Sequence, residues 1–441
     1  MRPRLALAPL SVVLLATPLH AQSRWSPISG DATTKITADG DLRAADGATV
    51  RTTAMRNGGA ITVVDAADFR GHDVELSAEI DVEDGGSASL WLRADGAEPG
   101  LAFATGADMP VRGNGARQTR RLRMYVPLAS ASLVLGVVLQ AQTTSALHGL
   151  RLRALPQAPS SSNAHAVLSA MLDAAQTHAL ASSRVDWPAL RARLLTDPLA
   201  SQPTGEAYTR FRDIARALGD RHSFATPPVD TARYAAQATP GAPLRSGIRE
   251  GVAFVAVPGL RGTDAAAGAR FSHELCAALS SLRTKAVHGW IVDLRGNDGG
   301  NMWPMLAGLS PLIGSARPGS FRFADGRLEP WRAEPAPGCA WTSDAPVAVL
   351  IGPRTRSSGE AVAIAFRGRP RTRFFGASTA GLSTSNQGFA LPDGGAAWIT
   401  TSVDVDRTGM VYPSGLQPDE TTPAGGDATD AAAKWLLSTA P

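Results

Sequence analysis

The feature that most limits the fold of this chain is a pair of short apolar segments, each followed by a turn rich in small residues. His288 to Leu294 reads H-G-W-I-V-D-L before R-G-N-D-G-G-N, and Val347 to Gly352 precedes R-T-R-S-S-G-E. Apolar runs without alternation are typical of parallel strands that are buried on both faces. With a further apolar strand pattern at 252–257 and helix patterns at 271–282 and 361–366, they predict that the last half of the chain is an α/β domain.

Both turns have a functional and a purely structural interpretation. Glycines after a buried strand let backbone N–H groups face an anion or oxyanion, but a tight strand-to-helix turn needs glycine as well. A serine at the start of a helix, such as Ser357 or Ser358, gains nucleophilicity from the helix N-terminus. The same serine is equally explained as an N-cap, with Glu360 completing a capping box.

The first third of the chain alternates with period two instead. Residues 74–82 carry an apolar side chain at every second position, and the alternation recurs at 88–92, 122–126 and 150–153. This pattern predicts an all-β, jelly-roll-like sandwich over residues 22–155, similar to the carbohydrate-binding domains of secreted enzymes. Trp91 is either a core residue, the commoner case, or a platform for a sugar ring, so a carbohydrate is a candidate ligand of this domain.

A linker and three helices are expected between these two parts. Residues 156–162 read P-Q-A-P-S-S-S, a linker composition, and a helical segment follows over 163–230. Asn163, Asp186 and Thr204 stand at the N-cap positions of its three helices. Gly219 ends the third helix, and His222 follows on a loop, as either a surface residue or a site residue. The peptidase-like core is then expected over 231–425 and a C-terminal helix over 426–441.

The N-terminus has the pattern of a secretory signal. Arg2 and Arg4 precede an apolar stretch that closes at Ala21, so residues 1–21 are interpreted as a signal peptide. The protein is therefore expected in the periplasm or outside the cell, without a stable membrane anchor. Cys276 and Cys339 are either two free thiols or one disulfide.

Composition excludes several other functions. The formal net charge is only +4, from 43 Lys and Arg against 39 Asp and Glu, and no basic block is present, so no nucleic-acid partner is expected. No zinc motif occurs, and neither a metal nor another cofactor is expected. The absence of G-x-S-x-G disfavours an α/β-hydrolase, and the absence of S-x-x-K excludes a β-lactamase-type site.

Several ordered motifs resemble those of the tail-specific, or C-terminal-processing, serine peptidases of family S41. Residues 289–300 are similar to the strand-plus-glycine motif of that family, and residues 355–360 to its nucleophile segment, T-A-S-x-x-E. Residues 375–381 match the next strand and turn, and residues 391–403 and 415–419 match the closing segments. The resemblance covers about residues 163–425 and implies a crotonase-like ββα core.

The resemblance also assigns roles to individual residues. It places the nucleophile at Ser357 and one oxyanion donor at the backbone N–H of Ser358. The second oxyanion donor would be Gly299 or Gly300, because two converging N–H groups are needed to hold a tetrahedral intermediate.

The general base departs from the commoner pattern of the family. Many members use a lysine at the position of Leu382, which cannot accept a proton. The tricorn-like branch uses a histidine from the segment after the helices, and His222 matches that position. The residue that orients the imidazole is expected to be Glu360 or, as a second choice, Asp220.

Two further departures concern substrate recognition. The segment between His222 and Val252 is too short for the PDZ domain that many relatives carry there. Arg356 replaces a small residue before the nucleophile, and it either reads an acidic group of the substrate or points to solvent.

Together these patterns predict a secreted or periplasmic serine peptidase that binds a peptide or protein substrate. The alternative is a catalytically inactive protein of the same fold that binds peptide or glycan, motivated by the missing lysine and the unassigned third residue. An acyl-transfer enzyme that uses CoA is disfavoured by the secretory signal. The sequence indicates neither the oligomeric state nor the cleavage preference.

Overall fold

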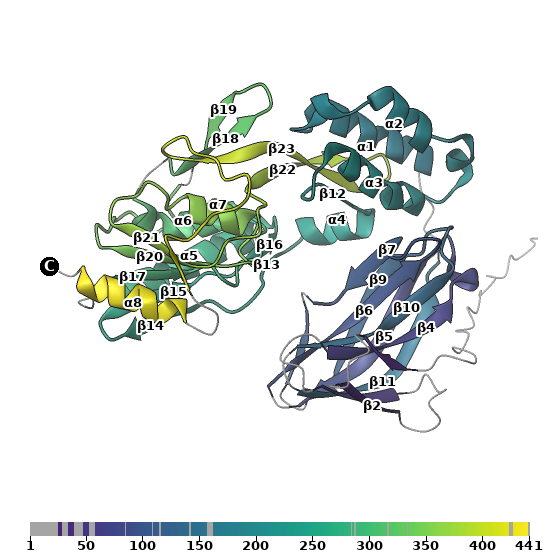
Figure 1. The fold of residues 1–441 in the computed structure, drawn as a ribbon, viewed down its shortest axis with the longest axis horizontal. Coiled ribbons are helices and arrows are strands. Elements are labelled where there is room, and N and C mark those ends of the chain that lie inside the picture. The colour runs from purple at the N-terminus through teal and green to yellow at the C-terminus, as the bar shows by residue number, and fades with distance from the viewer. Residues whose placement is uncertain are drawn as a thin grey trace, which may run out of the picture. The chain divides into compact units, whose positions relative to one another are not determined.

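The computed structural model divides into two compact units, Met1–Ser160 and Ser161–Pro441, here called the N-terminal and C-terminal units (Figure 1). It describes residues 25–28, 34–38, 47–52, 58–83, 85–107, 109–113, 116–140, 143–156, 162–283, 285, 288–314, 317–332, 334–422 and 427–439. The predicted signal peptide at 1–21 lies outside the described residues, as does most of the predicted linker.

The N-terminal unit consists of two antiparallel sheets. The first sheet contains, in spatial order, β1 (Ser26–Pro27), β4 (Gly58–Asp65), β10 (Ser132–Gln140), β6 (Ser87–Asp95) and β7 (Ala102–Thr105), with β8 (Val111–Arg112) paired to β6. The second contains β2 (Thr34–Ala38), β3 (Gly47–Thr52), β11 (Thr143–Ala154), β5 (Asp73–Val82) and β9 (Gln118–Tyr125). A 3₁₀ turn at Ala67–Phe69 precedes β5.

The alternating residues of these strands build one apolar core. Leu76 and Ile80 of β5 are buried in the same cluster as Leu90 and Leu92 of β6, so the two sheets pack face to face. Trp91 lies between two inward-facing leucines and therefore faces outward, which makes its interpretation as a core residue wrong. The predicted alternation is confirmed, whereas the jelly-roll assignment stays a prediction.

The C-terminal unit mixes helices and strands. Its α-helices are α1 (Ala164–His178), α2 (Trp187–Leu194), α3 (Gly205–Leu218), α4 (Pro228–Ala235), α5 (Ala265–Arg283), α6 (Met302–Ile313), α7 (Ser358–Ile364) and α8 (Ala428–Ser438), with 3₁₀ turns at Ser182–Arg184 and Asp197–Ser201. Its strands are β12 (Phe224–Thr226), β13 (Ala238–Pro240), β14 (Arg245–Arg249), β15 (Val252–Ala256), β16 (Leu260–Gly262), β17 (Gly289–Asp293), β18 (Gly319–Phe323), β19 (Leu328–Pro330), β20 (Val347–Ile351), β21 (Thr372–Gly376), β22 (Thr384–Ala390), β23 (Ala396–Asp406) and β24 (Glu420–Thr421).

A central sheet in the order β14-β15-β17-β20-β21-β24 organises this unit. Strands β15, β17, β20, β21 and β24 run parallel, and β14 pairs antiparallel at the edge. Helices α5, α6 and α7 pack on one face and α8 on the other (Figure 1). Coverage of both faces explains the unbroken apolar runs at 288–294 and 347–352, and it confirms the predicted α/β half. The crotonase-type assignment of this core stays a prediction.

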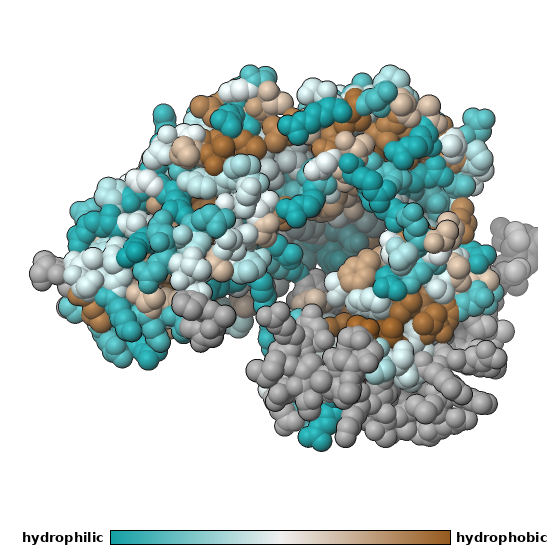
Figure 2. Space-filling view, viewed as in Figure 1, coloured by the Kyte–Doolittle hydropathy of each residue, from teal (hydrophilic) through white to brown (hydrophobic). Residues whose placement is uncertain are grey.

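Most apolar side chains of the C-terminal unit lie in such cores. The face of this unit seen in Figure 2 is mainly hydrophilic, with apolar residues gathered in patches near β18 and β23 and over the first helices. Among the described helices, none has both the length and the apolar character needed to cross a bilayer.

A second sheet, β12-β23-β18-β19 with β22 paired to β23, joins the helical segment to the rest of the unit. Ala397 and Ile399 of β23 are buried with residues of α1 and α3 such as Leu168 and Phe211. The helical segment, predicted as a bundle over 163–230, therefore shares a core with strand residues that come about 190 to 230 positions later in the chain.

The predicted helix ends are mostly confirmed. The side chains of Asn163 and Asp186 accept hydrogen bonds from the first turns of α1 and α2, and Gly219 ends α3 with a φ of 64°. The prediction of a Thr204 cap is wrong, because Thr204 has helical backbone angles and its side chain makes no cap hydrogen bond.

The two cysteines form a disulfide. Cys276 of α5 is bonded to Cys339 in the loop between β19 and β20, and both side chains are buried. The bond holds that loop against α5 and α6, where the N–H of Ala336 donates to the carbonyl of Ala307 at 3.1 Å.

Candidate active site

Ser357 stands at the turn between β20 and α7 in a conformation that few residues other than glycine adopt. Its φ is 53° and its ψ is −127°. The turn is held by Thr355, whose buried hydroxyl donates to the carbonyl of Leu294 at 2.8 Å and accepts from the N–H of Gly352 at 3.1 Å. Backbone strain at a residue that starts a helix is a recurrent feature of functional sites. Ser357 therefore lies in the turn between β20 and α7, directly before the first residue of the helix.

His222 meets this hydroxyl. Its Nε2 lies 2.8 Å from Ser357 Oγ, although the two residues are separated by 135 positions in the chain. The loop is held from both sides: the N–H of His222 donates to Asp220 Oδ1 at 2.7 Å, and Asn386 Nδ2 donates to the His222 carbonyl at 2.8 Å. The structure therefore brings together the two side chains predicted to react, at hydrogen-bond distance.

The other ring nitrogen of His222 faces a residue that the sequence analysis missed. Nδ1 lies 2.7 Å from the hydroxyl of Thr384, the first residue of β22. A hydroxyl at this distance can accept the Nδ1–H, which leaves Nε2 free to accept a proton from Ser357. No motif marks Thr384, and the only available signal was its place soon after the turn of residues 375–381.

The surroundings of His222 favour its neutral form. Burial lowers the pKa of the imidazole, and the Arg356 guanidinium lowers it further, while the Asp220 carboxylate acts in the opposite direction. A neutral imidazole is the form that can accept a proton from a serine.

Glu360 does not orient His222, and the expectation that it would is corrected by the structure. It is fully buried, and its carboxylate accepts from the N–H of Ser357 at 3.2 Å, of Gly381 at 3.0 Å and of Leu382 at 2.6 Å, and from the Thr379 hydroxyl. A side chain at the third position of a helix can reach the N–H groups at the start of that helix. Glu360 therefore completes a capping box with Ser357, as the structural interpretation of this turn predicted. Through these hydrogen bonds Glu360 connects the turn that carries Ser357 to residues 379–382, which precede Thr384.

Asp220, the second choice, also lies away from the imidazole nitrogens. Its carboxylate accepts from the N–H groups of His222 and Ser223 and from the Ser223 hydroxyl. It therefore shapes the loop rather than contacting Nδ1, which is already met by Thr384.

A second buried carboxyl, Asp404 of β23, lies close to Glu360. Burial and the negative charge of Glu360 raise the pKa of Asp404 to about 8. The raised pKa favours the protonated form of the Asp404 carboxyl.

The glycine turn after β17 lies against the start of α7. A Cβ on Gly299 would come within 3.0 Å of Ser357 Cβ and 3.4 Å of the Ser358 nitrogen, so this backbone is adjacent to the nucleophile. The N–H of Gly299 donates to Asn297 Oδ1 at 3.1 Å, and the carbonyl of Gly300 accepts from Ser358 Oγ at 2.5 Å. The predicted donors Gly299, Gly300 and Ser358 thus lie beside Ser357.

Asn297 joins the two turns and is buried. Its Nδ2 donates to the carbonyl of Val257 at 3.2 Å, and its own carbonyl accepts from the N–H of Arg356 at 3.2 Å. Gly359 packs so closely that a Cβ there would lie 2.5 Å from the Asn297 carbonyl oxygen.

Arg356 is half-exposed next to the site. Its guanidinium lies 3.6 Å from the carboxylate of Asp298, which also pairs with Arg261 at 2.5 Å. The Arg356 side chain is therefore partly exposed to solvent, as one prediction had it, but its charge also pairs with the Asp298 carboxylate.

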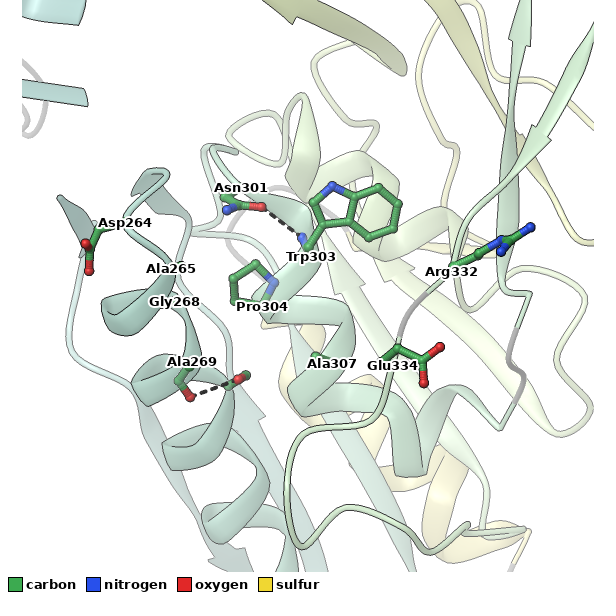
Figure 3. A pocket seen from close by; sticks show the side chains of 11 residues that line it. Asp264, Ala265, Gly268, Ala269, Asn301, Trp303, Pro304, Ala307, Arg332 and Glu334 are labelled. Carbon is green, nitrogen blue, oxygen red and sulfur yellow. Dashed lines mark hydrogen bonds between the residues drawn. The ribbon is translucent and has the colours of Figure 1, made fainter. Parts of the chain in front are cut away.

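A cavity of about 320 Å³ opens beside the glycine turn. Figure 3 shows Asn301 and Trp303, which follow that turn at the start of α6, between Asp264 at the start of α5 and the loop residues Arg332 and Glu334. Among the described residues, no group of three His, Cys, Asp or Glu side chains is arranged to hold a metal ion.

Comparison with known proteins relates the chain to a peptidase family. The family model of peptidase family S41 matches residues 252–422. The nisin-resistance protein of Lactococcus lactis subsp. lactis is 30% identical over 269 residues, which are 57% of this chain and 80% of that protein. A lipoprotein from Streptococcus agalactiae is similar in structure with a TM-score of 0.55 and 24% identity, over 64% of this chain and 99% of that one. A photosystem II D1 C-terminal processing protease gives a TM-score of 0.45 and 14% identity, over 58% of this chain and 92% of that one.

Proposed function

The chain belongs to peptidase family S41, and from that premise we propose that it hydrolyses peptide bonds with Ser357 as nucleophile and His222 as general base. The observation that carries the proposal is the 2.8 Å contact between His222 Nε2 and Ser357 Oγ. A Ser–His pair replaces the lysine that Leu382 cannot provide.

The reaction begins when Ser357 Oγ attacks the carbonyl carbon of the substrate and its proton passes to His222 Nε2. The C–O π electrons move to the carbonyl oxygen, which becomes an oxyanion. Its donors are the N–H of Ser358 and a glycine N–H, and Gly300 is preferred to Gly299 because the N–H of Gly299 already donates to Asn297. The C–N bond then breaks, and the departing amine takes the proton from Nε2.

Water completes the cycle. It attacks the ester on Ser357 and gives a proton to His222 Nε2, which returns that proton to Ser357 Oγ as the acid product leaves. Thr384 accepts the Nδ1–H throughout, so that Nε2 always faces the reacting atoms. Burial lowers the pKa of the His222 imidazole, which favours the neutral form that accepts the proton of Ser357 and later the proton of water.

Labelling with a fluorophosphonate tests this assignment. The wild-type protein is expected to be labelled, and the Ser357→Ala and His222→Ala variants are expected to lose labelling. The alternative, an inactive binding protein of the same fold, predicts no labelling of the wild type. Nisin belongs among the first peptides to test as substrates, because the relative from Lactococcus is named a nisin-resistance protein.

We also propose that the protein works outside the cytoplasm, in the periplasm or outside the cell. The Cys276–Cys339 disulfide supports this location, because such bonds persist in oxidising compartments. The charged and apolar pattern at residues 1–21 supports it independently. Fractionation of the native host with an antibody to the protein would test it, and detection in the cytoplasm alone would contradict it.

A carbohydrate is the proposed ligand of the N-terminal unit. Trp91 faces outward, Phe103 meets it edge to face with ring centroids 5.8 Å apart, and the Arg93 guanidinium lies 5.3 Å from its ring. An outward aromatic ring with a polar neighbour is suited to stacking on a sugar. Retardation of the protein in gels that contain polysaccharides is expected, and Trp91→Ala should abolish it.

A further inference from the structure

The sheet formed by β12, β23 and β22 has one face that α1 and α3 do not cover. Phe224, Trp398 and Gly388 lie side by side across these three strands, so their side-chain positions share one face. The alternate residues, such as Ala397 and Ile399, point to the other face and are buried with α1 and α3. Figure 1 shows α1 and α3 on one side of these strands and α4 on the other.

Three rings form an aromatic patch on the face away from α1 and α3, here defined as Phe224, Trp398 and Tyr234. Phe224 is stacked on Trp398 with ring centroids 5.9 Å apart, yet 46% of its surface is exposed. Tyr234 of α4 meets Trp398 edge to face at 5.3 Å. An exposed phenylalanine in a pre-ordered aromatic group offers an apolar surface to a ligand without a large loss of side-chain entropy.

The ring of Trp398 is fixed in place by its neighbours. Its Nε1 donates to the Thr226 hydroxyl at 3.0 Å. A Cβ on Gly388 would lie 2.9 Å from the ring, so this glycine gives the indole the space that it occupies. These contacts hold the Trp398 ring, at the centre of the patch, in one position on the sheet.

The patch is connected to the candidate active site along the chain and through hydrogen bonds. Phe224, the first residue of β12, follows His222 by two residues, which span at most about 7 Å. The intervening Ser223 accepts from the N–H of Thr400, and Thr400 donates to Asn386, which holds the carbonyl of His222. One residue of an extended peptide also spans about 3.3 Å, so a side chain one or two residues from the scissile bond can reach the patch.

The role of His222 indicates which side of the substrate lies here. The imidazole must deliver its proton to the departing amine, so the peptide on the leaving-group side passes close to His222. The patch begins two residues after His222, at Phe224, the first residue of β12. We propose that the aromatic patch binds an apolar or aromatic side chain of the substrate, one or two residues after the scissile bond. This inference rests on the proposed peptidase function.

The test has two stages, so that the two proposals fail separately. Fluorophosphonate labelling of the wild type, with Ser357→Ala as the blank, first establishes the reactive serine. A library of internally quenched peptides, varied at the two positions after the cleavage site, then measures selectivity. The wild type is expected to cleave peptides with Phe or Leu at one of these positions about tenfold faster than peptides with Ser, judged by kcat/KM.

Variants of Phe224 test whether the aromatic patch is the source of this selectivity. Phe224→Ala should reduce this selectivity ratio to near one, and Phe224→Trp should preserve it. Leu328→Ala is the matched control, because Leu328 is an exposed apolar residue of β19 outside the patch. Damage to the His222 loop would lower kcat/KM for all peptides alike and leave the ratio intact. A labelled wild type with no apolar preference after the cleavage site, or an unchanged ratio in Phe224→Ala, would overturn the inference.

Discussion

At the scale of single residues, the proposed chemistry depends on a hydroxyl that holds an imidazole. Thr384 meets Nδ1 of His222 at 2.7 Å, where many serine peptidases place a carboxylate. A neutral hydroxyl selects the tautomer without adding a negative charge. The Thr384 hydroxyl therefore supports His222 as a base by fixing the orientation of the imidazole, and not by placing a negative charge next to Nδ1.

Replacing Thr384 by valine tests this role, because valine keeps the shape and removes only the hydroxyl. The loss of one hydrogen bond of about 1.5 kcal/mol should lower kcat/KM about tenfold. Thr384→Ser is the control and should stay close to the wild type. Equal peptide hydrolysis by Thr384→Val and the wild type would show that the imidazole is oriented by something else.

The acid limb of the pH profile tests the state of His222. Burial and the Arg356 guanidinium lower the pKa of the imidazole, so kcat/KM should fall only below about pH 6.5, the ordinary histidine value. Arg356→Gln removes a cation that disfavours the imidazolium, and the acid limb should therefore move to higher pH. Arg354→Gln is the matched control, since Arg354 is not among the groups that shift this pKa. An acid limb that stays in place in Arg356→Gln would contradict the assignment.

Residue-level patterns in the sequence located Ser357 and His222 but not the partner of the imidazole. The first two lie in motifs whose spacing is shared with a known family. Thr384 begins a polar strand, and only the pairing of β22 with β23 brings it to His222. Glu360 was assigned wrongly because sequence spacing on a helix does not reveal which backbone groups its carboxylate faces.

At the scale of elements, the site depends on two turns that pack against each other. The start of α7 lies on the turn after β17, and Gly359 is the point of closest approach to Asn297. Two loops that end parallel strands come together at one edge of the sheet, where ligands bind in open α/β folds. Small changes in this packing should therefore be transmitted to Ser357.

Gly359→Ala tests that packing. A Cβ at this position would lie 2.5 Å from the Asn297 carbonyl oxygen, so one of the turns must shift. The free energy of unfolding should fall by about 1–3 kcal/mol, and fluorophosphonate labelling should slow. Gly352→Ala is the control, since its nearest neighbour would lie 3.8 Å away. Wild-type labelling and stability in Gly359→Ala would show that the contact is not needed.

The disulfide gives a second prediction at this scale. Cys276 and Cys339 enclose a segment with a sequence separation of 63, so the bond limits the freedom of the unfolded chain. The Cys276→Ser, Cys339→Ser double variant should lose about 2–4 kcal/mol in its free energy of unfolding by denaturant titration. A wild-type protein with the same denaturation midpoint in the presence and absence of reductant would argue against the bond.

The elements themselves were largely predictable, because their apolar patterns are local. Strands β15, β17 and β20 lie within the predicted segments, whereas α5 (Ala265–Arg283) begins six residues before the helix predicted at 271–282 and ends one residue after it. No individual helix or strand was predicted between His222 and Val252, where the structure has β12, α4, β13 and β14, and β12 lies within the segment 163–230 that was predicted to be helical. These short elements are held by contacts with distant residues, such as that of Phe224 with Trp398, which no local pattern encodes.

At the scale of the whole molecule, each unit has a core of its own. The core between the two sheets of the N-terminal unit contains residues of that unit alone. Every residue proposed to take part in catalysis, from His222 to Thr384, belongs to the C-terminal unit. A unit with its own buried core is expected to fold on its own, so catalysis should not require the N-terminal unit.

A cleavable form of the full chain tests this independence. With a recognition sequence for a specific protease inserted in the linker sequence at 157–161, digestion should release two fragments that each keep a cooperative thermal transition. The C-terminal fragment should retain fluorophosphonate labelling at the rate of the intact protein, with Ser357→Ala as the blank. Binding to polysaccharide should remain with the N-terminal fragment alone. A C-terminal fragment that unfolds or loses labelling after cleavage would mean that its fold or its site depends on the other unit, in spite of the separate cores.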